Sequence, residues 1–158
     1  MNIALRARWL WLQRVDDSKP WKELNIQVPQ VVRQLFEGAT YSVLGDGAST
    51  FFWTDRWLPE GRLADVAPNL VKAIPKRLTH LRKVREGLIG AWLDDIPPDL
   101  DASAIRELFD VADRLEDVAL MEGVEDSFRW GWEKDFSYSA RSGYRAMFGG
   151  RIEMQGAL

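Results

Sequence analysis

Hydrophobic residues recur every three or four positions in several stretches of the chain, which is the spacing of a helix with one buried face. In the first stretch, Ile3, Ala7 and Leu10 share such a face, and Asn2 is a residue type that caps helix starts. The last helix is expected to stop at Gly149-Gly150. The pattern predicts helices over residues 2–15, 29–37, 65–73, 79–86, 103–116 and 140–148.

Strand formers gather in two other regions. Tyr41–Leu44 and Thr50–Thr54 flank the loop Gly45–Ser49, which predicts a β-hairpin with a glycine-containing loop. Hydrophobic and polar residues alternate over 128–133, and a turn would let 136–139 return as the partner strand. The sequence therefore predicts an α+β fold, with short helices and two β-hairpins in a single small domain. This domain would cover residues 1–150, with a frayed tail over 151–158.

The composition fits one compact domain with a real core. The 158 residues are 46% hydrophobic, and 21 Lys+Arg against 24 Asp+Glu give a net charge of −3. Residues 1–93 hold 14 of the cations and 9 of the acids, and residues 94–158 hold 7 and 15. The basic residues gather around His80 and the acidic ones between Asp94 and Asp126. This asymmetry indicates either a nucleic-acid-binding face or two halves that attract each other.

Several kinds of chemistry are excluded or disfavoured. The chain has no cysteine, which excludes disulfides, thiol catalysis and thiolate zinc sites, and its one histidine excludes a two-histidine metal centre. His80 has no acidic or nucleophilic neighbour in sequence that could orient it as a general base. Ser137, Ser139 and Ser142 lack the Gly-x-Ser-x-Gly context and are expected to cap or border the last helix. The chain has no signal sequence and no apolar run of the roughly 20 residues that span a bilayer, so we expect an intracellular protein.

Two motifs are similar to known sites but lack their context. Gly45–Thr50 is similar to a dinucleotide-binding glycine loop, but an aromatic strand is expected after it in place of a helix. Trp92–Asp95 is similar to the aromatic-x-Asp-Asp of reverse transcriptases. However, Pro97 follows closely and could not donate to a returning strand. Neither motif predicts a cofactor or a catalytic residue.

The densest cluster of large side chains is Trp53–Trp57, and it has two interpretations. In one, both indoles are buried where the hairpin ends, and Asp55 accepts a backbone N–H. In the other, Trp53 and Trp57 stack on nucleic-acid bases, each stack contributing roughly 1–3 kcal/mol.

Four segments carry motifs in a characteristic order: residues 2–14, 44–58, 63–70 and 136–148. The most specific phrase is Gly45-Asp46-Gly47 followed by Phe52-Trp53-x-Asp55-x-Trp57-Leu58. Together they resemble the region of plant non-LTR (LINE-type) retrotransposon proteins that follows the polymerase and leads into the reverse transcriptase zinc-binding region. The resemblance covers nearly the whole chain.

The chain also departs from this family. The family's catalytic aspartates lie upstream of these segments and its Cys and His zinc ligands lie downstream, so neither set maps onto a residue here. The family usually has glycine in the turn before the Tyr-Ser strand, where this chain has Phe136. The resemblance therefore implies a fragment, truncated before the Cys/His motif, with no catalytic, cofactor-binding or metal-binding residue.

The sequence predicts a non-catalytic connector that acts as a structural spacer or scaffold beside the polymerase of a retrotransposon-derived protein. A nucleic-acid-binding module for RNA or DNA is the alternative, and an interaction module that uses the acidic stretch is a third option. The contacts of the nucleic-acid-binding module would be Arg6, Arg8, Trp53, Trp57, Lys76, Arg77, Arg82, Lys83 and Arg85.

Overall fold

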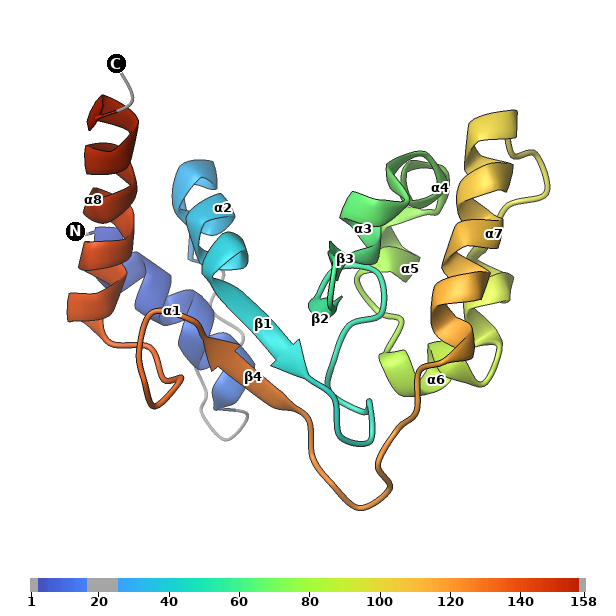
Figure 1. Ribbon diagram of the computed structural model, residues 1–158, viewed down its shortest axis with the longest axis horizontal. Coiled ribbons are helices and arrows are strands. Elements are labelled where there is room, and N and C mark those ends of the chain that lie inside the picture. Colours follow the sequence, from blue (N-terminus) through green and yellow to red (C-terminus); the bar gives the residue numbers. More distant parts are fainter. Residues whose placement is uncertain (1–2, 17–25, 157–158) are drawn as a thin grey trace. The chain divides into compact units, whose positions relative to one another are not determined.

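The computed structural model describes residues 3–16 and 26–156, with side chains up to Phe148. Helices and two small two-stranded sheets alternate along the chain, so the predicted α+β class is confirmed (Figure 1). The residues group into two compact units: unit 1 comprises Met1–Tyr41 and Phe128–Leu158, and unit 2 comprises Ser42–Ser127. The elements are α1 (Ile3–Val15), α2 (Gln30–Ala39), β1 (Thr40–Val43), β2 (Arg56–Leu58), β3 (Gly61–Arg62), α3 (Leu63–Val66), α4 (Pro68–Ala73), α5 (Lys76–Thr79), α6 (Val84–Leu88), the 3₁₀ helix η2 (Ala91–Asp95), α7 (Ala102–Glu116), β4 (Ser127–Trp130) and α8 (Ala140–Gly156).

Unit 1 is built on the packing of α8 against α1 and α2 (Figure 1). The predicted apolar stripe of α1 is partly buried: Ala7 and Leu10 face the core of this unit, whereas Ile3 is 39% exposed. Trp130 is 1% exposed, and its ring centroid lies 5.9 Å from that of Phe36. The hydroxyl of Tyr138 donates a hydrogen bond to a backbone carbonyl of α1. Aromatic residues thus form the centre of a core that Ala7 and Leu10 of α1 and Ala146 and Met147 of α8 complete.

The core of unit 2 forms around two fully buried aromatic residues. The rings of Phe52 and Trp53 meet edge to face at 4.7 Å, and Trp92 packs against both. Helix α7 lies beside α4 (Figure 1) and buries Val111 in the same core. The helix is predicted to start at Ser103, and it starts at Ala102, where the carboxylate of Asp101 accepts the amide of Ala104 at 2.8 Å.

Neither hairpin forms where it is predicted. Strand β1 pairs with β4, which is far away in sequence, and the backbone after Thr50 is bonded to the segment before α6. The amide of Phe52 donates to the carbonyl of Arg82, and the amide of Val84 donates to the carbonyl of Thr50. Residues 136–139 form no strand. Among the described residues, the one hairpin is the short pair β2 and β3, in which Arg56 lies opposite Arg62.

The last helix is longer than predicted. It passes through Gly149-Gly150 and ends at Gly156, so the predicted stop at these two glycines is wrong. Glycine costs a helix interior about 1 kcal/mol and ends it only when another conformation is favoured. The predicted cap at Asn2 lies outside the described residues. Within the part of the chain that the structure describes, no helix has the length and apolar character needed to cross a membrane.

Candidate functional site

The loop of residues 45–50, here called the oxyanion loop, closes around the carboxylate of Asp126. Asp126 Oδ1 accepts the amides of Gly45 at 2.7 Å and Gly47 at 2.9 Å. Asp126 Oδ2 accepts the amides of Ser49 at 3.0 Å and Thr50 at 3.1 Å, and also the two hydroxyls, at 3.3 Å and 2.9 Å respectively. Consecutive backbone N–H groups that point into one concavity are a general way of binding an anion.

Glycine is required at both ends of the Gly45-Asp46-Gly47 phrase. A Cβ on Gly45 would overlap the backbone carbonyl of Val124, and Gly47 has φ of 73°, in the left-handed region. A Cβ on Gly47 would also lie 2.8 Å from the amide nitrogen of Arg85. Gly45 therefore lets the segment before β4 lie directly on the loop, and Gly47 lets the start of α6 do so.

The hydrogen bonds fix the ionisation of Asp126. Burial alone would raise the pKa of this carboxyl, but the amides of Gly45, Gly47 and Ser49 and the hydroxyl of Thr50 outweigh burial and lower the pKa below its ordinary value. The carboxylate is thus held in its charged form by the loop. The sequence signal for the loop was visible in its glycines. The sequence could not identify Asp126 as the residue that the loop binds, because Asp126 lies 76 to 81 positions away in the chain.

A second buried network joins Trp53, Asp95 and Arg82. Asp95 is 2% exposed, and its Oδ2 accepts the indole N–H of Trp53 at 3.0 Å and Nε of Arg82 at 2.9 Å. The Arg82 guanidinium also contacts the other carboxylate oxygen. The hydrogen bond to Asp95 raises the pKa of Arg82 above its ordinary value. Asp95, which ends the motif similar to that of reverse transcriptases, is therefore the buried partner of an arginine.

The Trp53–Trp57 cluster is part of the core. Trp53 is fully buried and Trp57 is 9% exposed, with its indole N–H bonded to the carbonyl of Phe52 at 2.9 Å. Asp55 accepts the amide of Phe51 at 2.8 Å, as the core interpretation predicts. The burial of both rings supports the core interpretation over the alternative in which Trp53 and Trp57 stack on bases.

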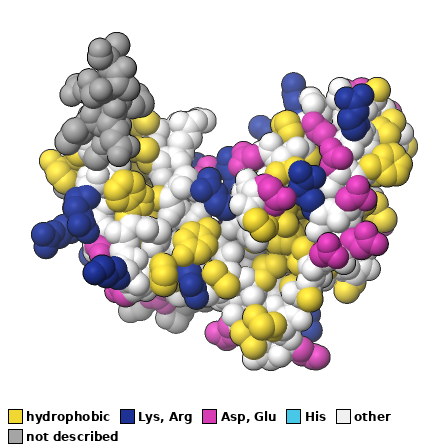
Figure 2. Space-filling model, in the orientation of Figure 1, with side chains coloured by type: hydrophobic (Ala, Val, Ile, Leu, Met, Phe, Trp, Pro, Cys, Tyr) yellow, Lys and Arg dark blue, Asp and Glu magenta, His cyan; other side chains and the backbone are white. Residues whose placement is uncertain are grey.

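The predicted basic contacts fall into separate groups. Arg82 is bound to Asp95. Lys83 Nζ lies 3.6 Å from the ring centroid of Phe51, and Arg85 lies 3.9 Å from Asp46. On the face of unit 2 that Figure 2 shows, acidic, basic and hydrophobic side chains are interspersed.

The other predicted cations lie on α5 and α1. Lys76 and Arg77 are exposed on α5. Arg6 and Arg8 lie on α1, in unit 1, where Arg6 is half-buried and Arg8 is exposed. Burial raises the pKa of Tyr138 to about 12, against a smaller opposing effect of the Arg8 charge.

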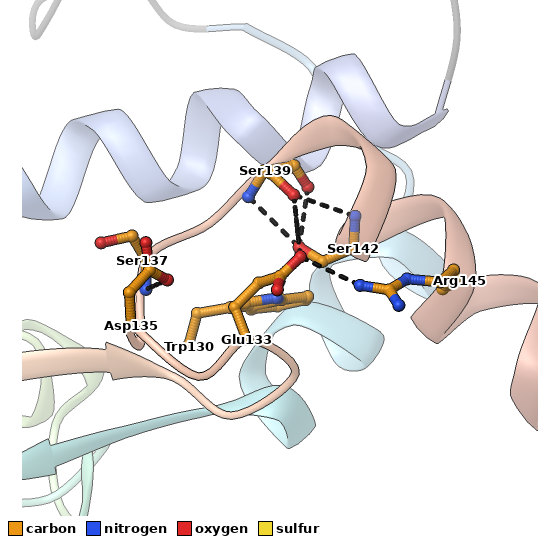
Figure 3. Close-up of polar contacts among 7 residues, drawn as sticks. All are labelled: Trp130, Glu133, Asp135, Ser137, Ser139, Ser142 and Arg145. Atoms are coloured by element: carbon orange, nitrogen blue, oxygen red, sulfur yellow. Dashed lines mark hydrogen bonds and ion pairs between the residues drawn. The ribbon is translucent and has the colours of Figure 1, made fainter.

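The three serines near the end of the chain organise the start of α8 (Figure 3). The hydroxyl of Ser139 accepts the amide of Ser142 at 3.0 Å, as a helix cap does. The hydroxyl of Ser142, which is fully buried, accepts the indole N–H of Trp130 at 3.0 Å. Glu133 binds both the Ser139 hydroxyl at 3.2 Å and Arg145 at 3.0 Å, while Ser137 donates its amide to a turn aspartate (Figure 3). The prediction that these serines cap or border the helix is confirmed.

One backbone position has a conformation that its residue type rarely adopts. Phe136 has φ of 60°, and among the described residues it is the one non-glycine residue in the left-handed region. Its ring packs edge to face with Tyr41 and lies under the guanidinium of Arg129 at 4.7 Å. These contacts stabilise a turn whose backbone favours glycine.

Among the described side chains, His, Asp and Glu residues do not gather in a group of three that could hold a metal ion. No protein-family model, curated protein or solved structure matches the chain.

Proposed function

We propose that the chain is a non-catalytic scaffold segment of a retrotransposon-derived protein and acts as a packed spacer beside the polymerase. One observation carries this proposal. In the motif that most specifically resembles the family, the polar groups form hydrogen bonds within the chain. The oxyanion loop binds Asp126, Trp53 binds Asp95 and Trp57 binds a backbone carbonyl. A motif whose polar groups bind one another specifies a shape and leaves little to bind a substrate.

The turn at Phe136 supports the proposed family origin. In the LINE-type proteins that the chain resembles, this position is usually glycine, and the backbone here has the positive φ that glycine adopts without strain. The backbone conformation at this position thus suits glycine, the usual residue in that family, better than it suits phenylalanine. Packing against Tyr41 and Arg129 offsets part of the cost.

For the alternative function, a nucleic-acid-binding module, fewer residues are available to contact nucleic acid than the sequence predicts. Without the two tryptophans and with Arg82 bound to Asp95, the exposed cations of α5 are its best-supported contacts. A counterion-release contribution from so few phosphate contacts would be small, and the affinity would fall only modestly with salt.

The test of the scaffold function is association with a polymerase. The chain would be co-expressed with the reverse-transcriptase polymerase of a plant LINE-type element and analysed by size-exclusion chromatography. We expect co-elution of the two, lost in Asp126→Asn and kept in Asp135→Asn, an exposed carboxylate in a local turn. Separate elution of a folded chain, or turnover by the chain alone that one substitution abolishes, would refute the proposal.

A further inference from the structure

A cavity of about 300 Å³ lies where α4 is followed by α5 in unit 2. Its lining combines apolar and cationic side chains: Val71, Lys72, Ile74, Lys76, Thr79 and His80. The volume equals that of roughly ten water molecules in the liquid, which is room for a phosphate group with an attached sugar. The hydroxyl of Thr79 donates to the carbonyl of Lys76 at 2.8 Å and so holds the backbone that carries this lysine.

The charge of this region is uniform along the chain. Between Asp65 and Glu86 there are cations and no acidic residue, and four of these cations form two groups by their contacts. Arg82 and Arg85 face carboxylates of the chain itself. Lys72 and Lys76 are exposed at the cavity, and no carboxylate is among the residues that line it.

We propose that this cavity is a binding site for a phosphate group, as carried by a nucleotide or by the backbone of a single-stranded nucleic acid. Each lysine ammonium has three N–H donors and attracts a phosphate as a point charge. The apolar side chains of Val71 and Ile74 exclude water from one side of the ligand, which strengthens this attraction. They also give the sugar or base a surface to contact. The site is independent of the scaffold function.

His80 makes the proposal directly measurable. It is the single histidine of the chain, so its ring protons give unassigned spectra one unambiguous reporter inside the cavity lining. The full-length chain would be titrated with inorganic phosphate while the His80 ring signal is followed by proton NMR at constant pH and ionic strength. Adenosine monophosphate and a short single-stranded RNA would form two further titrations, with sodium chloride as the reference.

The expected result is a saturable shift of the His80 signal with phosphate at millimolar concentration and with adenosine monophosphate at lower concentration. The double variant Lys72→Ala/Lys76→Ala should lose at least tenfold in affinity. Arg77→Ala is the matched control, because Arg77 is exposed on α5 beside Lys76 but does not line the cavity, and it should stay within twofold of the wild type.

The RNA titration identifies the source of the phosphate. If RNA shifts the His80 signal and competes with adenosine monophosphate, the cavity accepts a phosphodiester; if only the nucleotide does so, the natural ligand is a free phosphate ester. An unchanged His80 signal with both phosphate and adenosine monophosphate, a shift equal to that in sodium chloride, or undiminished phosphate binding by the double variant would each overturn the proposal. Far-ultraviolet circular dichroism would confirm that the variants are folded, as expected for exposed helical lysines changed to alanine.

Discussion

Replacing Asp126 by asparagine is the sharpest perturbation of the fold that the structure suggests. The change keeps the shape of the side chain but turns one acceptor oxygen into an NH₂ donor. If this NH₂ takes the place of Oδ1, it faces the amides of Gly45 and Gly47, and if it takes the place of Oδ2, it faces those of Ser49 and Thr50. Either orientation removes at least two hydrogen bonds to a charged acceptor.

The expected loss follows from these bonds. A hydrogen bond to a charged group contributes about 1.5–3 kcal/mol, so two lost bonds lower the free energy of unfolding by about 3 kcal/mol at the least. Gly45 and Gly47 are buried and water cannot readily replace the carboxylate there, whereas the exposed Ser49 can bind water. The lower end of the range is appropriate because Asp126 is itself half-buried.

Urea denaturation followed by tryptophan fluorescence and circular dichroism would measure this loss at pH 7. The folded-state pKa of Asp126 lies below its unfolded value of about 3.9. Its stabilisation is therefore complete well above pH 4 and disappears as the pH falls through the folded value. The wild type should thus lose its advantage over Asp126→Asn in acid. Asp135→Asn, the control, should stay within about 0.5 kcal/mol of the wild type. An Asp126→Asn variant within 1 kcal/mol of the wild type at pH 7 would refute the reasoning.

Three further perturbations test other parts of the fold. Arg82→Met leaves the carboxylate of Asp95 buried without its cation and should lower the free energy of unfolding, measured by urea denaturation, by about 3–5 kcal/mol. A decrease below about 1 kcal/mol would contradict this expectation. Calorimetry should show a lower melting temperature for Gly143→Ala, whose new methyl meets the Tyr138 hydroxyl, and a higher one for Gly38→Ala, whose methyl meets open space. Since the folded pKa of Tyr138 is raised to about 12 from about 10, wild-type stability should fall as pH rises between these values. Tyr138→Phe should flatten that fall.

Local signals in the sequence sufficed for three of the long helices. The helices at Ile3–Val15, Gln30–Ala39 and Ala102–Glu116 appear within a few residues of their predicted bounds, because each has an apolar stripe at helical spacing. The burial of Trp53 and Trp57 likewise agrees with the weight of large aromatic residues in a core.

The strand pairing could not be read from the sequence. Tyr41–Leu44 has strand composition, but its partner Ser127–Trp130 lies beyond the whole of unit 2, and short-range turn signals favoured a hairpin instead. The same difficulty hid the main polar networks. Nothing near Asp126 or Asp95 in sequence indicates that one binds the oxyanion loop and the other Arg82, because both pairings depend on tertiary packing.

The division of the chain has a consequence for folding. Unit 2 is one uninterrupted stretch, whereas unit 1 combines Met1–Tyr41 with Phe128–Leu158. Leu10, Trp11 and Phe36 share a core with Ala146 and Met147 of α8, so unit 1 depends on contacts between residues far apart in the sequence. Such contacts form slowly because the entropy of closing a long loop must be overcome first, so we expect unit 1 to be the slower of the two to fold.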